Sequence, residues 1–240
     1  MKKIIILILV CKFFYSNAQE KINFSSLDGI KITADLYKIN DTSNYIVLCH
    51  LAEHSRGEYK ETAVKLNKLG FNCLAIDTRT GNEVFGIKNQ THIEAINKKK
   101  GTEYLDSEQD IIAAINFTDS INNNKGVILL GSSFSASLAL KIATTHKKVK
   151  AVLAFSPGEY FGDKLNLKNT IKKLNKPVFV TSSKEESSNL KLLIENIKSK
   201  NKTQFIPIGK GAHGSIALWP FIENNEEYWT ATIKFLKSVI

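Results

Sequence analysis

The pattern of apolar and polar positions changes character near residue 45. Before it, residues 21–37 alternate between polar and apolar around Asp28-Gly29, and such a dipeptide between two alternating runs is typical of a β-hairpin. After it, short continuous apolar runs alternate with segments whose apolar residues recur at helical spacing. The continuous runs predict strands at residues 45–50, 71–77, 127–130, 149–155, 177–181 and 203–208. The other segments predict helices at residues 57–70, 104–121, 134–145, 188–199 and from 226 onward.

A hairpin followed by alternating strands and helices predicts an α/β fold. Its centre is a mostly parallel sheet with an N-terminal antiparallel hairpin and helices on both faces. A chain of 240 residues suits one domain. The segment between Phe155 and Pro177 has room for one short helix, so we expect no large lid. Functional residues of such sheets follow the carboxyl ends of the strands.

Residues 1–18 are interpreted as a signal peptide. They open with two lysines, continue with the apolar run IIILILV and end in the small-x-small sequence SNA before Gln19. Lipid attachment at Cys11 is the alternative, but Val10 stands where a small residue is expected. Cleavage after Ala18 is therefore favoured, which predicts an exported mature domain of residues 19–240 in the periplasm or outside the cell.

Charge and cysteine usage narrow the class of protein. The formal net charge is +10, and the leader contributes three of these charges, which leaves +7 on the mature chain. Its lysines are scattered, as on a solvated surface, and no nucleic-acid motif accompanies them. Beyond the leader no stretch is apolar and long enough to cross a bilayer. Cys49 and Cys73 lie in apolar runs and are expected to be buried free thiols.

The most informative stretch is VILLGSSFSASLALKIA, residues 127–143. A buried strand turns within about three residues into a helix, with Ser133 at the bend, which is the setting of a nucleophile elbow. The residues two before and two after such a serine must be small, and Gly131 and Ser135 meet this demand. Ser132 has bulky residues at both positions, and Ser135 lies too far past the strand. The alternative is an ordinary turn whose serines cap the helix.

A serine nucleophile requires a base, which is histidine in most such sites. All five histidines follow the leader. His213 lies between glycines in a loop after the last strand, which makes it the best candidate. His146 is expected at the far end of a helix and His92 in a polar loop. His50 and His54 belong to another feature, described below.

The base must be held by an acid, which should follow the strand at 177–181. Glu186 falls where this acid usually lies, and Glu185 is the second choice. Glu159, after the preceding strand, is a third option. A carboxylate in a lysine-bearing loop could equally be solvated surface.

Backbone N–H groups must hold the oxyanion. We expect them from Phe134, after the nucleophile, and from Leu51 or Ala52 in the turn after residues 45–50. His50 and His54 are four residues apart, but they lie in a strand-end turn rather than on a helix, so no metal site is predicted.

Six motifs, taken in their order along the chain, resemble those of α/β-hydrolases, and of their dienelactone hydrolase-like branch in particular. They are CHLAEHSRGEY, AIDTRTG, YLD, GSSFSASLAL, AFSPGEYF and GAHGS. The resemblance covers residues 21–240. It implies hydrolysis of a small-molecule acyl substrate by a serine or cysteine nucleophile, a histidine and an acid, without cofactor or metal.

Three departures from the family pattern limit what can be carried over. Leu51 and Ser135 stand where glycine is usual, and serine and glutamate replace the cysteine and aspartate of the dienelactone hydrolases proper. The sequence therefore predicts an exported serine hydrolase with a Ser-His-Glu triad, and leaves ester, thioester, lactone and peptide substrates open. A peptidase of the same fold is one alternative. A non-catalytic binding protein, favoured by the departures, is the other.

Overall fold

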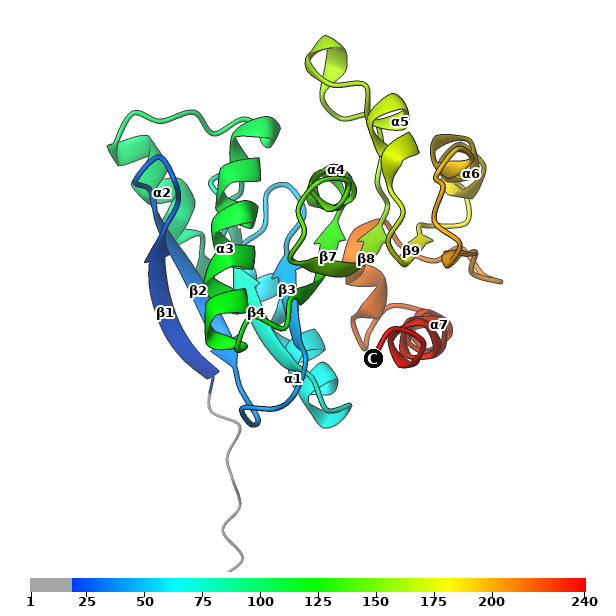
Figure 1. Ribbon diagram of the computed structural model, residues 1–240, viewed down its shortest axis with the longest axis horizontal. Coiled ribbons are helices and arrows are strands. Elements are labelled where there is room, and N and C mark those ends of the chain that lie inside the picture. The colour runs from blue at the N-terminus through cyan, green and yellow to red at the C-terminus, as the bar shows by residue number, and fades with distance from the viewer. Residues whose placement is uncertain (1–18) are drawn as a thin grey trace, which may run out of the picture.

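The computed structural model describes residues 19–240, and the signal peptide predicted for residues 1–18 lies outside the described residues. An eight-stranded sheet runs through the middle of this domain in the order β1-β2-β4-β3-β7-β8-β9-β10 (Figure 1). The pairs β1–β2 and β2–β4 are antiparallel, and the other five pairs of the sheet are parallel. The strands are β1 (Gln19–Ser25), β2 (Lys31–Tyr37), β3 (Tyr45–Cys49), β4 (Asn72–Ile76), β7 (Val127–Ser132), β8 (Val149–Phe155), β9 (Val178–Thr181) and β10 (Lys202–Phe205). The predicted α/β fold is confirmed.

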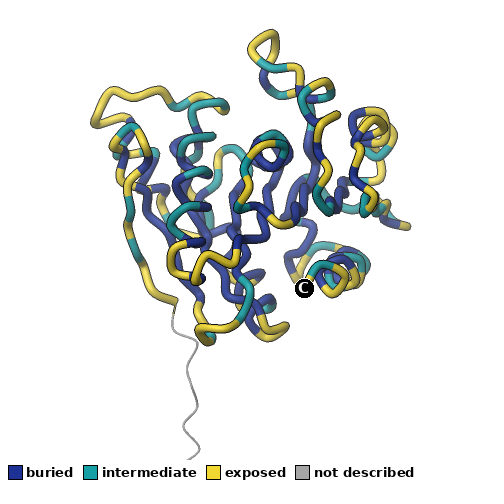
Figure 2. Tube along the Cα trace, in the orientation of Figure 1, coloured by how far each residue is buried: buried dark blue, intermediate teal, exposed yellow. Residues whose placement is uncertain are grey.

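Helices cover both faces of the sheet, as Figure 1 shows. The core on one face includes residues of α3, α4, α5 and α6, and the core on the other includes residues of α1 and α7. Figure 2 shows that the central strands are buried between these layers. The helices are α1 (Lys60–Lys68), α2 (Gln90–Asn97), α3 (Glu108–Ile121), α4 (Phe134–Ala143), α5 (Leu167–Thr170), α6 (Ser187–Ile194) and α7 (Asn225–Lys237). Every helix within residues 19–240 is too short or too polar to cross a membrane.

The hairpin turn and the cysteines follow the predictions. β1 and β2 pair over their whole length, from Gln19 opposite Tyr37 to Ser25 opposite Lys31. Cys49 and Cys73 are free and buried. They pack into the cores on opposite faces of the sheet, which prevents a disulfide between them.

Between β4 and α3 the structure differs from the prediction. A two-stranded hairpin, β5 (Glu83–Val84) with β6 (Ile87–Lys88), precedes α2. His92 lies in the first turn of α2, so its placement in a polar loop is wrong. The buried residues of α2 are Thr91 and Ala95, and so weak an apolar stripe gives little helical signal.

Several boundaries also move. β10 ends at Phe205, three residues before the predicted end, because Pro207 cannot donate to a neighbouring strand and Ile208 is 82% exposed. β7 continues two residues past Leu130, up to Ser132. The segment between β8 and β9 forms short helical turns at Gly162–Lys164, α5 and Ile171–Lys173, which agrees with the expected absence of a large lid over this segment of the described chain.

Candidate active site

Ser133 lies at a sharp bend between the central strand β7 and the helix α4. β7 pairs with β3 on one side and β8 on the other. The backbone of Ser133 has φ 58° and ψ −122°, a region that non-glycine residues rarely occupy and that costs on the order of 1–3 kcal/mol. Its N–H donates to the Phe155 carbonyl at 2.8 Å, and its own carbonyl accepts from Ala136 N at 2.9 Å. The strain is therefore fixed by the strand on one side and the helix on the other.

The residues two before and two after Ser133, Gly131 and Ser135, are small for different physical reasons. A Cβ on Gly131 would lie 2.5 Å from the Ser135 carbonyl oxygen and 2.6 Å from Ala136 N, so only glycine fits there. Ser135 is fully buried, yet its hydroxyl has partners: it donates to the Cys49 carbonyl at 2.7 Å and accepts from Ser132 N at 2.9 Å. The serine at this position thus ties the start of α4 to the end of β3, and the departure from glycine is accommodated.

The structure brings Ser133, His213 and Glu186 into one hydrogen-bonded chain. His213 Nδ1 lies 2.5 Å from Glu186 Oε1, and His213 Nε2 lies 2.9 Å from Ser133 Oγ. A carboxylate can only accept, so Nδ1 carries the proton and Nε2 accepts from the Ser133 hydroxyl. This is the arrangement in which an imidazole can remove the proton of a serine.

The loop that carries His213 depends on a glycine. Gly214 has φ +72°, and a Cβ there would lie 2.6 Å from Ser132 Oγ. Ser132 Oγ in turn accepts from Ser215 N at 2.8 Å. The histidine loop is therefore held directly against the end of β7.

Glu186 is surrounded by donors. Its second oxygen, Oε2, accepts from Ser156 Oγ at 2.9 Å, Ser183 Oγ at 3.0 Å and Ser183 N at 3.1 Å. Burial opposes ionisation, but the hydrogen bond from His213, together with those from both serine hydroxyls, outweighs it and lowers the pKa of Glu186 from 4.5 to about 2. Glu186 is therefore an anion at neutral pH. Its stabilising contribution is present above pH 4.5 and is lost as the pH falls toward 2.

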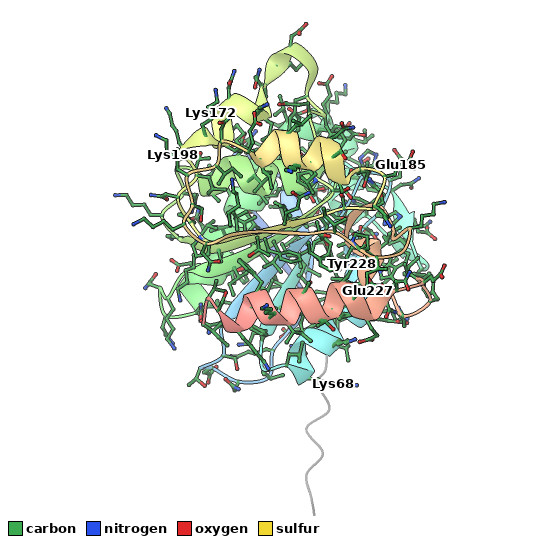
Figure 3. The ribbon with its side chains drawn as sticks, turned by 90° about the vertical axis from the view of Figure 1, so that its right-hand side faces the viewer. Lys68, Lys172, Glu185, Lys198, Glu227 and Tyr228 are labelled. Atoms are coloured by element: carbon green, nitrogen blue, oxygen red, sulfur yellow. The ribbon has the colours of Figure 1, made fainter. Side chains whose placement is uncertain are left out.

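The two alternative acids lie elsewhere. Glu185 is exposed at the surface beside the start of α6, as Figure 3 shows. The carboxylate of Glu159 accepts from Leu167 N and Lys168 N, each at 2.8 Å, and so binds the first turn of α5. Neither contacts His213.

The candidate oxyanion donors differ in availability. Phe134 N is the first amide of α4, which has no acceptor within its helix. Leu51 N donates to Glu58 Oε2 at 2.9 Å, so this amide is not free to bind the oxyanion. Ala52 N has no hydrogen-bond acceptor within residues 19–240. Phe134 and Ala52 are therefore the donors that the geometry leaves open.

Glu58 connects the loop after β3 with the histidine loop, and sequence reasoning missed it. Its side chain is fully buried and binds Leu51 N, His54 Nδ1 at 3.0 Å and Ser215 Oγ at 2.5 Å. Burial favours the neutral acid, but these bonds outweigh it and lower the pKa of Glu58. The sequence placed it in an ordinary amphipathic helix, where a glutamate reads as solvent-facing.

His50 and His54 have separate structural roles. His50 is buried, and its Nε2 accepts from Thr78 N at 3.0 Å. His54 pairs with Glu58. Across residues 19–240, no group of three or more His, Cys, Asp or Glu side chains could hold a metal ion.

A cavity of about 600 Å³ lies near the site, although Ser133 itself does not line it. Tyr160 lines it, lies close enough to Ser133 to interact with its hydroxyl, and donates its own hydroxyl to the Ser156 carbonyl at 2.8 Å. Tyr104 also lines it and stacks on Phe134 with 4.7 Å between ring centroids. These tyrosines come from segments far apart in the chain, so no local sequence signal could have grouped them.

The sequence and the fold are similar to those of known hydrolases. The sequence model of the dienelactone hydrolase family matches residues 46–239. The esterase Pf2001 of Pyrococcus furiosus is 18% identical with a TM-score of 0.71, over 93% of each chain. The dienelactone hydrolase of Anabaena variabilis is 14% identical with a TM-score of 0.71, over 93% of this chain and 98% of that one. At these identities the likeness shows the fold alone. The search of curated proteins found no match.

Proposed function

Because the chain belongs to the dienelactone hydrolase family and is thus a hydrolase, we propose that it is a serine hydrolase that cleaves carboxylic esters or related small acyl compounds. The observation that carries this proposal is the hydrogen-bonded chain from Ser133 through His213 to Glu186. The strained bend at Ser133 supports it, since such strain is retained where function requires it.

The reaction follows from the positions of these groups. Ser133 Oγ attacks the acyl carbon while His213 Nε2 takes its proton, and the N–H groups of Phe134 and Ala52 hold the oxyanion. His213 then gives the proton to the leaving-group oxygen, and an acyl-enzyme remains. Water attacks this ester with His213 again as base, which releases the acid and restores the Ser133 hydroxyl. Glu186 holds the imidazole in the required tautomer and stabilises its charged form.

The features that favoured a non-catalytic binding protein are explained by other contacts. Ser135 is satisfied within the bend, and Leu51 leaves the amide of its neighbour Ala52 free. Neither departure removes the nucleophile, the base or the acid. Catalysis is therefore the better account of the site.

Labelling with a serine-directed fluorophosphonate tests the proposal. The wild-type protein should form a covalent adduct at Ser133, because His213 activates that hydroxyl. The Ser133→Ala variant should remain unlabelled, and Ser120→Ala, at an exposed position of α3, serves as the matched serine control. Labelling of Ser133→Ala to the wild-type extent would contradict the assignment of the nucleophile.

Export is the second part of the proposal. The two lysines, the apolar run and the small-x-small sequence before Gln19 support cleavage after Ala18. We expect N-terminal sequencing of the mature protein, expressed with its leader, to read Gln19 first. Soluble protein that retains Met1 would contradict it.

A further inference from the structure

The cavity of about 600 Å³ near the site has aromatic walls that are held in place. Tyr104 is fixed by stacking on the buried Phe134, and Tyr160 by its bond to Ser156. Phe161 is 6% exposed and completes this wall. A volume of about 600 Å³ suits a small molecule. Because the rings are already ordered, a planar aromatic group can pack on them at little cost in entropy.

One defined hydrogen-bond acceptor also lines the cavity. His92 Nδ1 lies 2.8 Å from the Arg79 carbonyl oxygen, which can only accept, so Nδ1 carries the proton. In the neutral imidazole Nε2 is then an acceptor. Within residues 19–240 this nitrogen has no partner, and it is not sealed off from solvent. His92 therefore selects for a donor, such as a hydroxyl, on the bound molecule.

The charges around the cavity disfavour an anionic ligand. The ammonium of Lys164 pairs with the carboxylate of Glu103, and Glu53 adds a further negative charge. The guanidinium of Arg79 is 2% exposed and engaged by Asp28 and Asp110. Among the described residues that line this cavity, two carboxylates, Glu53 and Glu103, face one ammonium, Lys164, so the lining carries a net negative charge that repels a bound carboxylate.

The position of the cavity relative to the histidine decides which part of an ester it receives. The leaving-group oxygen must lie next to His213 Nε2, which protonates it. Of the described residues, neither Ser133 nor His213 lines this cavity, so it receives a part of the substrate beyond the reacting atoms. Glu53, which directly follows Ala52, does line it, as does Tyr160 beside Ser133. We therefore assign this cavity to the acyl group, whose carbonyl oxygen is held at Ala52, rather than to the leaving group at His213.

We propose that this cavity is an acyl-binding site for uncharged aromatic carboxylic esters whose ring carries a hydrogen-bond donor that binds His92 Nε2. The proposal rests on the serine hydrolase function proposed above and names its substrate class. Tyr104, Tyr160 and Phe161 pack on the ring, and His92 selects a hydroxyl-substituted ring over an unsubstituted one.

Steady-state hydrolysis of methyl esters tests this, because methanol confines the aromatic group to the acyl part. The panel compares each 4-hydroxyphenyl ester with the matching phenyl ester at three distances between the ring and the carbonyl, namely benzoate, phenylacetate and cinnamate. Cyclohexylacetate tests the need for an aromatic ring, and a 4-carboxyphenyl ester tests the effect of a negative charge. For the best spacing, kcat/KM should be about tenfold higher with the hydroxyl than without it, as one hydrogen bond provides. Phenylacetate should exceed cyclohexylacetate by roughly fivefold.

Variants assign the effect to the cavity. In His92→Phe the preference for the hydroxyl should fall to about onefold, through KM rather than kcat. The control is His146→Gln, which changes a histidine beyond the end of α4 and should keep the full preference. The absence of any hydroxyl preference in the wild type, its persistence in His92→Phe, or a preference for the 4-carboxyphenyl ester would each overturn the proposal. Hydrolysis of 4-nitrophenyl acetate, with fluorophosphonate labelling of Ser133, separates these outcomes from a failure of the hydrolase function itself.

Discussion

Ser133→Ala and His213→Ala are each expected to lower kcat for 4-nitrophenyl acetate by roughly 10⁵-fold, because neither residue can work without the other. Ser133 donates its proton to His213 Nε2 across 2.9 Å, so removal of either side chain removes the same step. The double variant should therefore lose little more than each single one. Initial rates at saturating ester measure this, and circular dichroism checks that the variants fold.

The acid should be the mildest of the three. Glu186→Gln keeps the shape but loses the charge that faces imidazolium, and we expect about a 10²- to 10⁴-fold loss of kcat. Glu185→Gln and Glu159→Gln are the matched controls and should keep wild-type rates, since neither contacts His213. If Glu186→Gln were silent while Glu159→Gln abolished turnover, the assignment of the acid would be wrong.

For the nucleophile and the base, additive losses of kcat in the Ser133→Ala/His213→Ala double variant would contradict the proposal that the two residues act in one step.

Arg79→Met is expected to lower the free energy of unfolding by about 3–5 kcal/mol, the cost of breaking a buried ion pair from one side. Arg79 binds Asp110 Oδ1 at 2.8 Å and Asp28 Oδ2 at 2.8 Å, and Asp110 is fully buried. Methionine fills similar space but leaves the Asp110 carboxylate without its cation. Urea-induced unfolding monitored by tryptophan fluorescence measures the loss.

Two controls accompany this measurement. Lys38→Met removes an exposed partner of Asp41 and should change stability little, because solvent screens such pairs. Burial already raises the pKa of Asp110 despite Arg79. Without Arg79 the folded state should bind a proton there, so the destabilisation should shrink as the pH falls from 8 to 5. A loss below about 1 kcal/mol, or one independent of pH, would contradict a buried pair of this strength.

The parts of the protein that depend on short-range constraints could be predicted from the amino-acid sequence alone. The hairpin at Asp28-Gly29 and the buried strands follow from local apolar patterns, which fix which faces of an element must be covered. The bend at Ser133 could be recognised because it demands Gly131 locally. The position of Glu186 after β9 predicts it as the acid, although Glu185 next to it carries the same chemical group.

Contacts between groups that are distant in the chain could be identified only from the folded structure. It brings His213 Nδ1 to Glu186 and leaves Glu185 in solvent, because one residue's difference at the start of α6 turns a side chain inward or outward. In the folded structure the Leu51 amide donates to Glu58, a residue whose burial cannot be predicted from the local sequence pattern. The aromatic cavity likewise gathers Tyr104, Tyr160 and His92 from three separate segments. Packing, which acts between segments remote in the chain, sets these contacts, and a single sequence carries no direct record of it.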